Sequence, residues 1–195
     1  MRQFKHQDST ESDAELITHT LQGNTGAFGV LYDRYLHPLF RYIYYRVANY
    51  LEAEDLTELV FLKAWEALRT LDPKEVNFRA WLYRIAHNTV IDHHRSRKTE
   101  VSLENISDLH HKGLNPEQGV QEKFETAQLA EAVSQLSPDF QQVITCRFIL
   151  GISHAETAAI MNLKEGHVRV LQHRALKELK SLLTEKISYE RRIVR

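Results

Sequence analysis

Residues 78–98 have the sequence FRAWLYRIAHNTVIDHHRSRK, and this stretch is the most informative part of the chain. At about 100° per residue it predicts an amphipathic helix with two separate faces. The apolar face consists of Phe78, Leu82, Ile85 and Thr89, flanked by Trp81 and Ala86. The second face is narrow and polar, and it consists of Arg84, Asn88 and Arg95, followed by a cationic end with Arg97 and Lys98. A packed core explains the first face, whereas the second suits an acidic, hydrogen-bonding partner such as DNA.

A solvated polar face on an ordinary bundle helix would give the same pattern. A second segment, residues 136–183, favours the DNA interpretation because it has the layout of a helix-turn-helix. Ser137-Pro138 supplies an N-cap with proline at the first helical position, and Gly151 supplies a C-cap. Ser153–Glu156 forms a capping box, and Asn162-Leu163 forms a turn. The helix after this turn is the longer one and corresponds to a recognition helix.

The face of that helix opposite its apolar side carries the candidate base-reading residues. They are His167, Arg169, Val170, His173, Arg174 and Lys177. Arginine can read guanine or hold a phosphate, and an exposed Val170 could touch a thymine methyl group. We expect Arg174 and Lys177 to contact phosphates only.

Composition and charge agree with a helical nucleic-acid-binding protein. The chain has 195 residues, 43% of them hydrophobic, with four prolines and seven glycines, and long helical periods without strand alternation predict an all-α fold. The net charge is −1, but residues 79–98 and 164–180 are locally basic, and the segment 99–122 between them is mostly acidic. Basic helices joined by an acidic linker suit reversible DNA binding that relies on a larger partner for affinity.

Other features exclude several protein classes. A single cysteine, Cys146, excludes an intrachain disulfide framework, fits a reducing cytoplasm and is expected to be a buried structural thiol. The N-terminus is polar rather than a signal peptide, and no apolar run approaches the ~20 residues of a membrane span. The sequence therefore predicts a cytoplasmic protein without membrane insertion.

Four blocks, in this order and at this spacing, resemble the bacterial extracytoplasmic-function (ECF) sigma factors, which retain only sigma regions 2 and 4. The blocks are DAELI with AFGVLYDRYLHPLFRY near the N-terminus, AEDLTELVFLKAW at 53–65, FRAWLYRIAHNTVIDHHRSR at 78–97, and the segment 136–183. Together they cover most of residues 12–183. The resemblance implies an all-α protein with two small helical domains joined by a flexible acidic linker.

The expected domain layout follows from these blocks. It consists of a disordered tail at 1–11, a region 2 domain at 12–98, a linker at 99–122, a region 4 domain at 123–185 and a frayed tail at 186–195. The implied partners are core RNA polymerase and promoter DNA, both duplex and melted, and an anti-sigma factor is a further candidate.

A helix expected at 53–70 is apolar nearly all round, so it is either central in a bundle or also docked on a partner. Leu56, Val60 and Ala67 mark one side, and Phe61, Trp65 and Leu68 mark the other. By resemblance, its remaining arc grips the coiled-coil clamp of the largest polymerase subunit. The candidate polymerase-binding residues are Asp55, Glu58, Leu59, Leu62, Glu66 and Arg69. The family often has Gln-Glu where this chain has Glu58-Leu59, and that departure bears on the contact at Leu59.

By resemblance, the loop 72–77 and the helix after it recognise and melt the promoter −10 element. Melting requires a base to be taken from the stack while the single strand is held electrostatically. The candidate residues are Lys74, Asn77, Arg79, Arg84, Asn88, Arg95 and Arg97. The helix-turn-helix recognises the −35 element, but Lys164 replaces the usual serine N-cap and Arg169-Val170-Leu171 replaces the common Lys-Ser-Arg. Promoter preference therefore does not carry over from the family.

Two rival functions are a stand-alone helix-turn-helix regulator that binds duplex DNA and a metal-dependent hydrolase that uses the eleven histidines. The block 53–97 argues against the regulator, which needs no clamp-docking helix. The adjacent pairs His93-His94 and His110-His111 point about 100° apart on a helix and rarely chelate one metal, and no Cys/His cluster has zinc-site spacing. Neither a phosphate-binding loop nor a nucleophile motif is present. We therefore expect no catalytic residues, metal or cofactor.

Overall fold

The computed structural model describes residues 11–73, 77–100 and 120–193, and within these ranges the regular structure is helical throughout. In chain order the elements are α1 (Asp13–Leu21), α2 (Thr25–Val47), α3 (Tyr50–Ala67), the 3₁₀ helix η1 (Leu68–Thr70), α4 (Phe78–Glu100), α5 (Val120–Ser134), α6 (Pro138–Ile144), the π-helix η2 (Thr145–Ile149), α7 (His154–Met161) and α8 (Glu165–Ile193). The all-α prediction is confirmed. The tail expected at 1–11 lies almost entirely outside the described residues, as does most of the linker expected at 99–122.

Helices α1 to α4 form the first helical unit, and local capping signals in the sequence predicted part of it. Ser12 accepts a hydrogen bond from the Glu15 backbone N–H at 3.3 Å, and the Glu15 carboxylate accepts one from the Ser12 backbone N–H at 2.7 Å. This capping box fixes the start of α1. Helix α3 begins at Tyr50 rather than at 53, because the Asn49 side chain accepts a hydrogen bond from the Glu52 N–H and caps the helix earlier.

Helices α5 to α8 form the second unit and contain the predicted helix-turn-helix. Ser153 and Glu156 make the predicted capping box of α7, and Asn162 ends that helix in the left-handed conformation at φ 54°. Gly151 terminates the preceding helix at φ +64°, a conformation that favours glycine. Ser137 is the N-cap residue of α6 and Pro138 opens that helix, as expected, although the Ser137 side chain makes no capping hydrogen bond. Helix α8 continues to Ile193 and so includes most of the segment 186–195 that was expected to be a frayed helix end.

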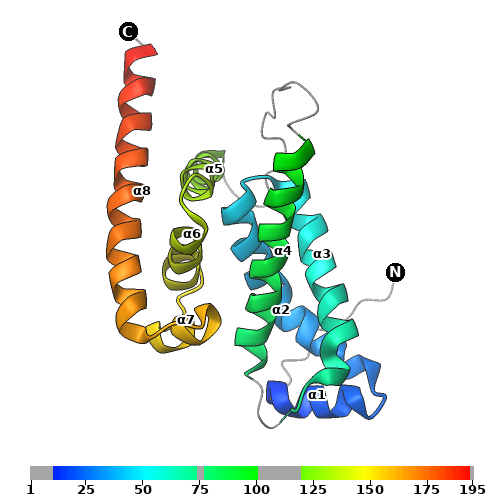
Figure 1. Cartoon of the computed structure of the whole chain (residues 1–195). Helices are drawn as coiled ribbons and strands as arrows, with labels where there is room; N and C mark the ends of the chain where they lie inside the picture. The colour runs from blue at the N-terminus through cyan, green and yellow to red at the C-terminus, as the bar shows by residue number, and fades with distance from the viewer. Residues whose placement is uncertain (1–10, 74–76, 101–119, 194–195) are drawn as a thin grey trace.

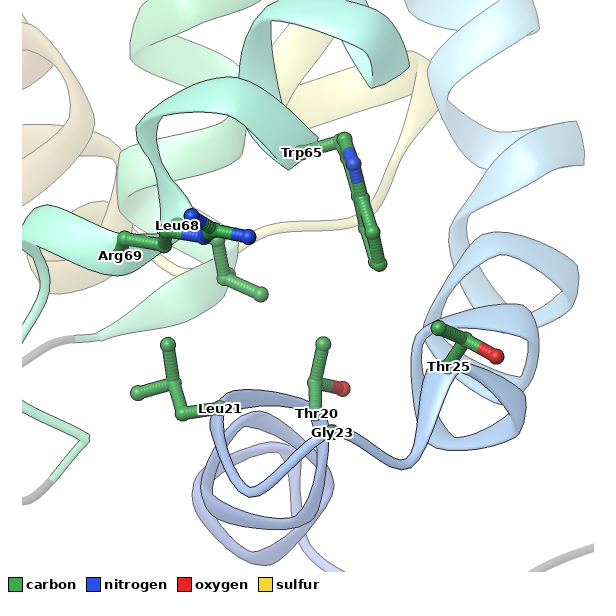
Figure 2. Close-up of a pocket in the computed structure, with 7 residues that line it drawn as sticks. All are labelled: Thr20, Leu21, Gly23, Thr25, Trp65, Leu68 and Arg69. Atoms are coloured by element: carbon green, nitrogen blue, oxygen red, sulfur yellow. The ribbon is translucent and has the colours of Figure 1, made fainter.

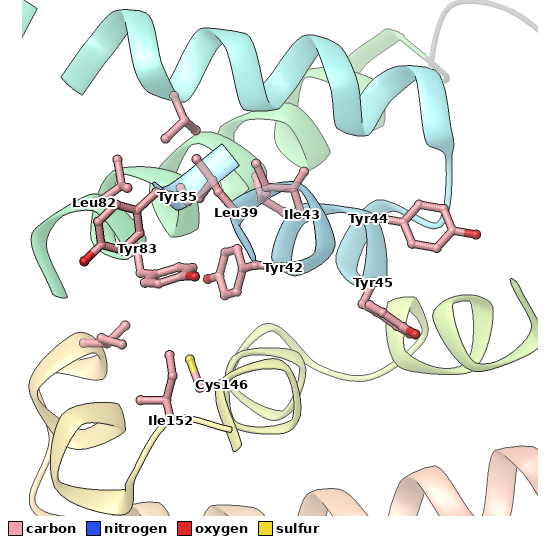
Figure 3. Close-up of a cluster of buried hydrophobic side chains, with 14 of the residues drawn as sticks. Tyr35, Leu39, Tyr42, Ile43, Tyr44, Tyr45, Leu82, Tyr83, Cys146 and Ile152 are labelled. Carbon is pink, nitrogen blue, oxygen red and sulfur yellow. The ribbon is translucent and has the colours of Figure 1, made fainter. Parts of the chain in front are cut away.

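The two units pack against each other. Helices α5, η2 and α7 contact α2 and α4, while α8 and α3 lie on opposite outer sides of the molecule (Figure 1). Tyr42 and Tyr83 of the first unit face Cys146 and Ile152 of the second, and all four side chains are buried (Figure 3). The ring centroids of Tyr42 and Tyr83 lie 5.1 Å apart in an edge-to-face arrangement. The apolar core is therefore continuous from one unit to the other.

Candidate partner and nucleic-acid interfaces

Helix α3 presents an exposed face on the side away from the second unit. All six residues assigned to polymerase binding are exposed, five on α3 and the last on η1 directly after it: Asp55, Glu58, Leu59, Leu62, Glu66 and Arg69. Two further apolar side chains on this face were missed. Leu51 is 61% exposed and lay outside the expected helix, and Trp65, which was placed on an apolar side outside the candidate arc, is 40% exposed. We call these eight residues the docking face.

The docking face is amphipathic rather than merely solvated. Leu51 and Leu62 expose more than half of their side chains among acidic neighbours, while Ala53, Val60 and Ala64 on the opposite side of α3 are fully buried. An exposed row of leucines ringed by charges is a common composition for a protein–protein contact. Helix α3 thus packs in the bundle on one side and exposes apolar side chains among charges on the other.

A shallow pocket of about 390 Å³ continues the docking face at its C-terminal end (Figure 2). Trp65, Leu68 and Arg69 line one wall. The other wall is formed by the end of α1, the turn after it and the start of α2, with Thr20, Leu21, Gly23 and Thr25. The Trp65 ring is held edge-to-face against Phe28, with centroids 4.9 Å apart. The packing therefore fixes Trp65 while leaving part of its ring in solvent.

The residues assigned to −10 recognition fall into different environments on α4. Asn77 accepts a hydrogen bond from the Ala80 N–H at 3.0 Å and so caps the helix. Arg79 and Arg84 reach the second unit, where Arg79 Nη1 lies 3.4 Å from Glu156 Oε1 and Arg84 Nη2 lies 3.5 Å from the Ala159 carbonyl oxygen.

The remaining −10 candidates lie further along the same helix or outside the described residues. Asn88 and Arg95 are exposed, and Lys74 lies outside the described residues. Arg97 Nη1 lies 3.0 Å from both carboxylate oxygens of Glu52 in α3. His93 also donates to Glu52, from Nε2 at 2.9 Å. One carboxylate therefore ties the start of α3 to the basic end of α4.

The six candidate −35 residues on α8 are all exposed, whereas Val168 and Ala175 on the opposite side are fully buried. Arg169 Nη2 donates to Glu165 Oε1 at 2.5 Å, and this ion pair lowers the pKa of the Glu165 carboxyl below its ordinary value. Gln172 anchors α8 to the rest of its unit, because its Oε1 lies 3.2 Å from Arg147 Nε and 3.0 Å from His154 Nε2. The face of α8 that was predicted to meet DNA is therefore exposed to solvent.

A buried polar cluster joins the two units, and sequence reasoning missed it. The Arg46 side chain of α2 is fully buried and donates to the Tyr42 hydroxyl and to Gln142 Oε1 of α6. Nδ1 of His87 in α4 lies 3.1 Å from Arg46 Nη1 and 2.9 Å from Gln142 Oε1. The cluster joins side chains up to 100 residues apart in the chain, so no local pattern marks it. We call Tyr42, Arg46, His87 and Gln142 the interdomain cluster.

Burial controls the protonation of the neighbouring groups. Desolvation, reinforced by the positive charge of Arg46, lowers the pKa of His87. Desolvation also raises the pKa of Cys146 to about 12, which confirms the expectation of an inert, buried thiol.

Among the described residues, no three His, Cys, Asp or Glu side chains could hold a metal ion together. Over the same part of the chain, no helix has the length and apolar character to cross a membrane.

Comparison with known proteins assigns the family. Residues 31–100 match Sigma-70 region 2, and residues 132–181 match Sigma-70, region 4. The chain is 40% identical to the ECF RNA polymerase sigma factor BldN of Streptomyces coelicolor over 173 residues, which cover 88% of this chain and 66% of BldN. It is 32% identical to the RNA polymerase sigma factor CnrH of Cupriavidus metallidurans over 182 residues, which cover 89% of this chain and 95% of CnrH.

Solved structures share this fold. The structure of CnrH in complex with the cytosolic domain of CnrY is similar with a TM-score of 0.70 at 27% identity, over 90% of this chain and 99% of that one. RpoE from Bartonella quintana, in complex with the anti-sigma factor NepR, has the same fold with a TM-score of 0.62 at 23% identity, over 79% of this chain and 96% of that one. The chain therefore belongs to the ECF RNA polymerase sigma factors and carries sigma regions 2 and 4.

Proposed function

We propose that this sigma factor docks on core RNA polymerase through the docking face of α3, melts and holds the promoter −10 element with α4, and reads the −35 element with α8. The observation that carries the proposal is the separation of three exposed surfaces on one chain. An amphipathic face on α3, a polar stripe on α4 and a basic face on α8 each point into solvent from a different helix.

The docking face supports polymerase binding because its chemistry suits a helical partner. Leu51 and Leu62 offer apolar anchors, and Asp55 and Glu66 beside them offer charges that orient a basic or amphipathic helix. A stand-alone regulator would have no use for this surface. We further infer that the protein acts in the cytoplasm with its polymerase and catalyses no reaction of its own.

The two DNA-facing helices support two different kinds of readout. Helix α8 follows a helix-turn-helix turn and presents Arg169 and Val170 near its start, where the side chains of this motif reach base edges. Helix α4 instead offers side chains that hydrogen-bond and cations along its length, an arrangement suited to an unpaired strand.

We also infer a protein partner of the anti-sigma type. The chain is similar over 90% of its length to CnrH, whose structure was solved in complex with the cytosolic domain of CnrY. An inhibitory partner of this kind should abolish transcription when added before polymerase and should lose its effect once the polymerase complex has formed.

Promoter-directed transcription with purified core polymerase, with and without this protein, tests the main proposal. Leu62→Asp places a charge in the middle of the docking face and should remove polymerase binding, whereas Leu62→Met keeps an apolar side chain and should not. Circular dichroism of both variants controls for folding. Full transcription with a folded Leu62→Asp variant would place the polymerase contact elsewhere. Tight, sequence-specific binding of free protein to duplex DNA would favour the regulator.

A further inference from the structure

Asp13, the first residue of α1, is bonded to two consecutive residues of α2. Its Oδ2 accepts a hydrogen bond from the Tyr35 hydroxyl at 2.5 Å, and its Oδ1 accepts one from Arg34 Nη1. Arg34 Nη2 also donates to the Glu11 carbonyl oxygen at 2.8 Å. Helix α1 carries none of the residues assigned to polymerase or DNA, so these bonds serve none of the three proposed surfaces directly.

The Tyr35 ring extends this link to the helix assigned to −10 binding. Tyr35 is buried, and its ring lies edge-to-face on Phe78, the first residue of α4, with centroids 5.5 Å apart. Phe78 is buried too, and its ring centroid lies 5.6 Å from that of Trp81 in the next turn. Helix α4 is therefore held at its first residue by a ring whose hydroxyl is bonded to Asp13.

The resting place of the Tyr35 ring depends on the Asp13 carboxylate. Desolvation raises the pKa of Tyr35, and the hydrogen bond to Asp13 and the charge of that carboxylate raise it further, so the hydroxyl stays protonated and donates. Loss of the carboxylate would leave a largely buried hydroxyl without this acceptor, and the ring would shift to bring the group to water. Arg34 holds the other carboxylate oxygen and so keeps the acceptor in place.

Two of the −10 candidates flank Phe78 in the chain. Asn77 precedes it and caps α4 through the Ala80 N–H, and Arg79 follows it. The positive charge of Arg79 also acts on the Tyr35 hydroxyl and opposes the rise in its pKa, so the guanidinium group lies near that hydroxyl. A shift of the Tyr35 ring would therefore displace both candidates. Small displacements of a group that positions a substrate can slow a reaction strongly.

We propose that Asp13 and Tyr35 are positioning residues for the −10 element. Asp13 holds the Tyr35 ring against Phe78. That contact sets Asn77 and Arg79 in the geometry in which they receive the DNA strand, while neither Asp13 nor Tyr35 touches DNA itself. Helix α1 thereby takes part in promoter melting from behind the helix that holds the strand. This proposal rests on the proposed −10 role of α4.

Removal of one hydroxyl group tests it. Polymerase with the Tyr35→Phe variant should bind a duplex promoter as tightly as the wild type, but should open it about threefold to tenfold more slowly, which is the net effect of one hydrogen bond. Permanganate reactivity of the unpaired thymines measures opening. Tyr44→Phe is the matched control, because Tyr44 is as buried as Tyr35 and lies on the same helix, but its ring stacks on Phe40 of α2. It should open the promoter at the wild-type rate.

A double-mutant cycle separates positioning from a purely structural role. If the Tyr35 hydroxyl acts through the cation of Arg79, its loss should slow opening little further in an Arg79→Ala background. A general loss of stability would instead multiply the two defects. Asp13→Ala removes the acceptor of the same hydrogen bond. It should reproduce the Tyr35→Phe defect, and the two substitutions together should open the promoter no more slowly than Asp13→Ala alone.

Circular dichroism controls for folding, and opening rates are compared at a temperature at which every variant is fully helical. The positioning role is overturned if Tyr35→Phe opens the promoter as fast as Tyr44→Phe, or if its defect multiplies with that of Arg79→Ala. In either case a slow Arg79→Ala variant leaves the −10 role of α4 standing. Normal opening by both Asn77→Ala and Arg79→Ala would instead overturn that role and the positioning role together.

Discussion

Nδ1 of His87 lies 2.9 Å from Oε1 of Gln142, although His87 belongs to α4 of the first unit and Gln142 to α6 of the second. This contact places a titratable group where the two units pack against each other. Arg46 and Asp139 are the charged groups that act on it, the first against protonation and the second in its favour. The protonation state of His87 therefore affects how the two units associate.

Acid should weaken the packing of the two units. Histidine has an ordinary pKa of 6.5, and burial together with Arg46 lowers the pKa of His87 where the units are packed. Above pH 6.5 His87 is neutral whether the units are packed or separated, so pH has no effect through this group. Below it, separated units bind a proton that packed units do not, and the packing loses stability until the pH has also passed the lower pKa of packed His87. The radius of the chain in small-angle scattering should therefore grow between pH 7.5 and 5.5, and His87→Asn should flatten that response.

Arg84→Ala and Asn88→Ala should slow open-complex formation more than they weaken initial polymerase binding. Each removes a side chain that would hold the displaced strand, and one lost hydrogen bond to a charged group is worth about 1.5–3 kcal/mol, or roughly tenfold to a hundredfold in rate. A pre-melted promoter bubble should recover part of the loss. Equal defects on duplex and bubble templates would point to a purely electrostatic role.

Asn77 should prove to be a helix cap first. Its side chain accepts from the Ala80 N–H, so Asn77→Ala should lower the free energy of unfolding by about 1 kcal/mol, while Asn77→Asp should preserve it. Urea denaturation followed by circular dichroism measures both. If Asn77→Asp keeps the stability but loses promoter melting, Asn77 also contacts DNA, because the added negative charge repels phosphate.

Arg169 should read a base of the −35 element, and Lys177 should contact only the backbone. Loss of a bidentate base contact costs about 1–3 kcal/mol and relaxes specificity at one position, whereas loss of a phosphate contact weakens all sequences alike and lowers the salt slope by about one. Transcription from a library of randomised −35 sequences separates the two. Arg169→Ala should flatten preference at one or two positions, and Lys177→Ala should lower output evenly. The reverse pattern would mean that the helix enters the groove in the opposite direction.

Local signals in the sequence predicted most of the fold. The capping boxes at Ser12 and Ser153 each depend on residues three positions apart, and both form as expected. The start of α3 was missed because it depends on the cap from the Asn49 side chain, and the apolar Leu51 in its first turn is exposed. Helical periodicity determines which side chains share a face, so it predicted the exposed residues of α8 and all those of the α3 face except Leu51 and Trp65.

Contacts between the units could not be predicted in the same way. Arg46 occupies a position in α2 that the pattern cannot distinguish from an exposed one, and it is buried in contact with His87 of α4 and Gln142 of α6. Trp65 shows the opposite error, because it was placed on an apolar side outside the candidate docking arc whereas it is 40% exposed. Periodicity assigns faces within a helix, but the pairing of those faces over long sequence separations depends on the whole packing arrangement.

The contacts of Glu52 affect the orientation of α4 relative to α3. Its single carboxylate holds His93 and Arg97, and it does so from the first turn of the helix that carries the docking face. If polymerase grips α3, as we propose, it therefore also sets the direction in which the basic end of α4 points. The orientation of the helix proposed to hold the DNA strand would then be fixed at the moment of docking, before any DNA arrives.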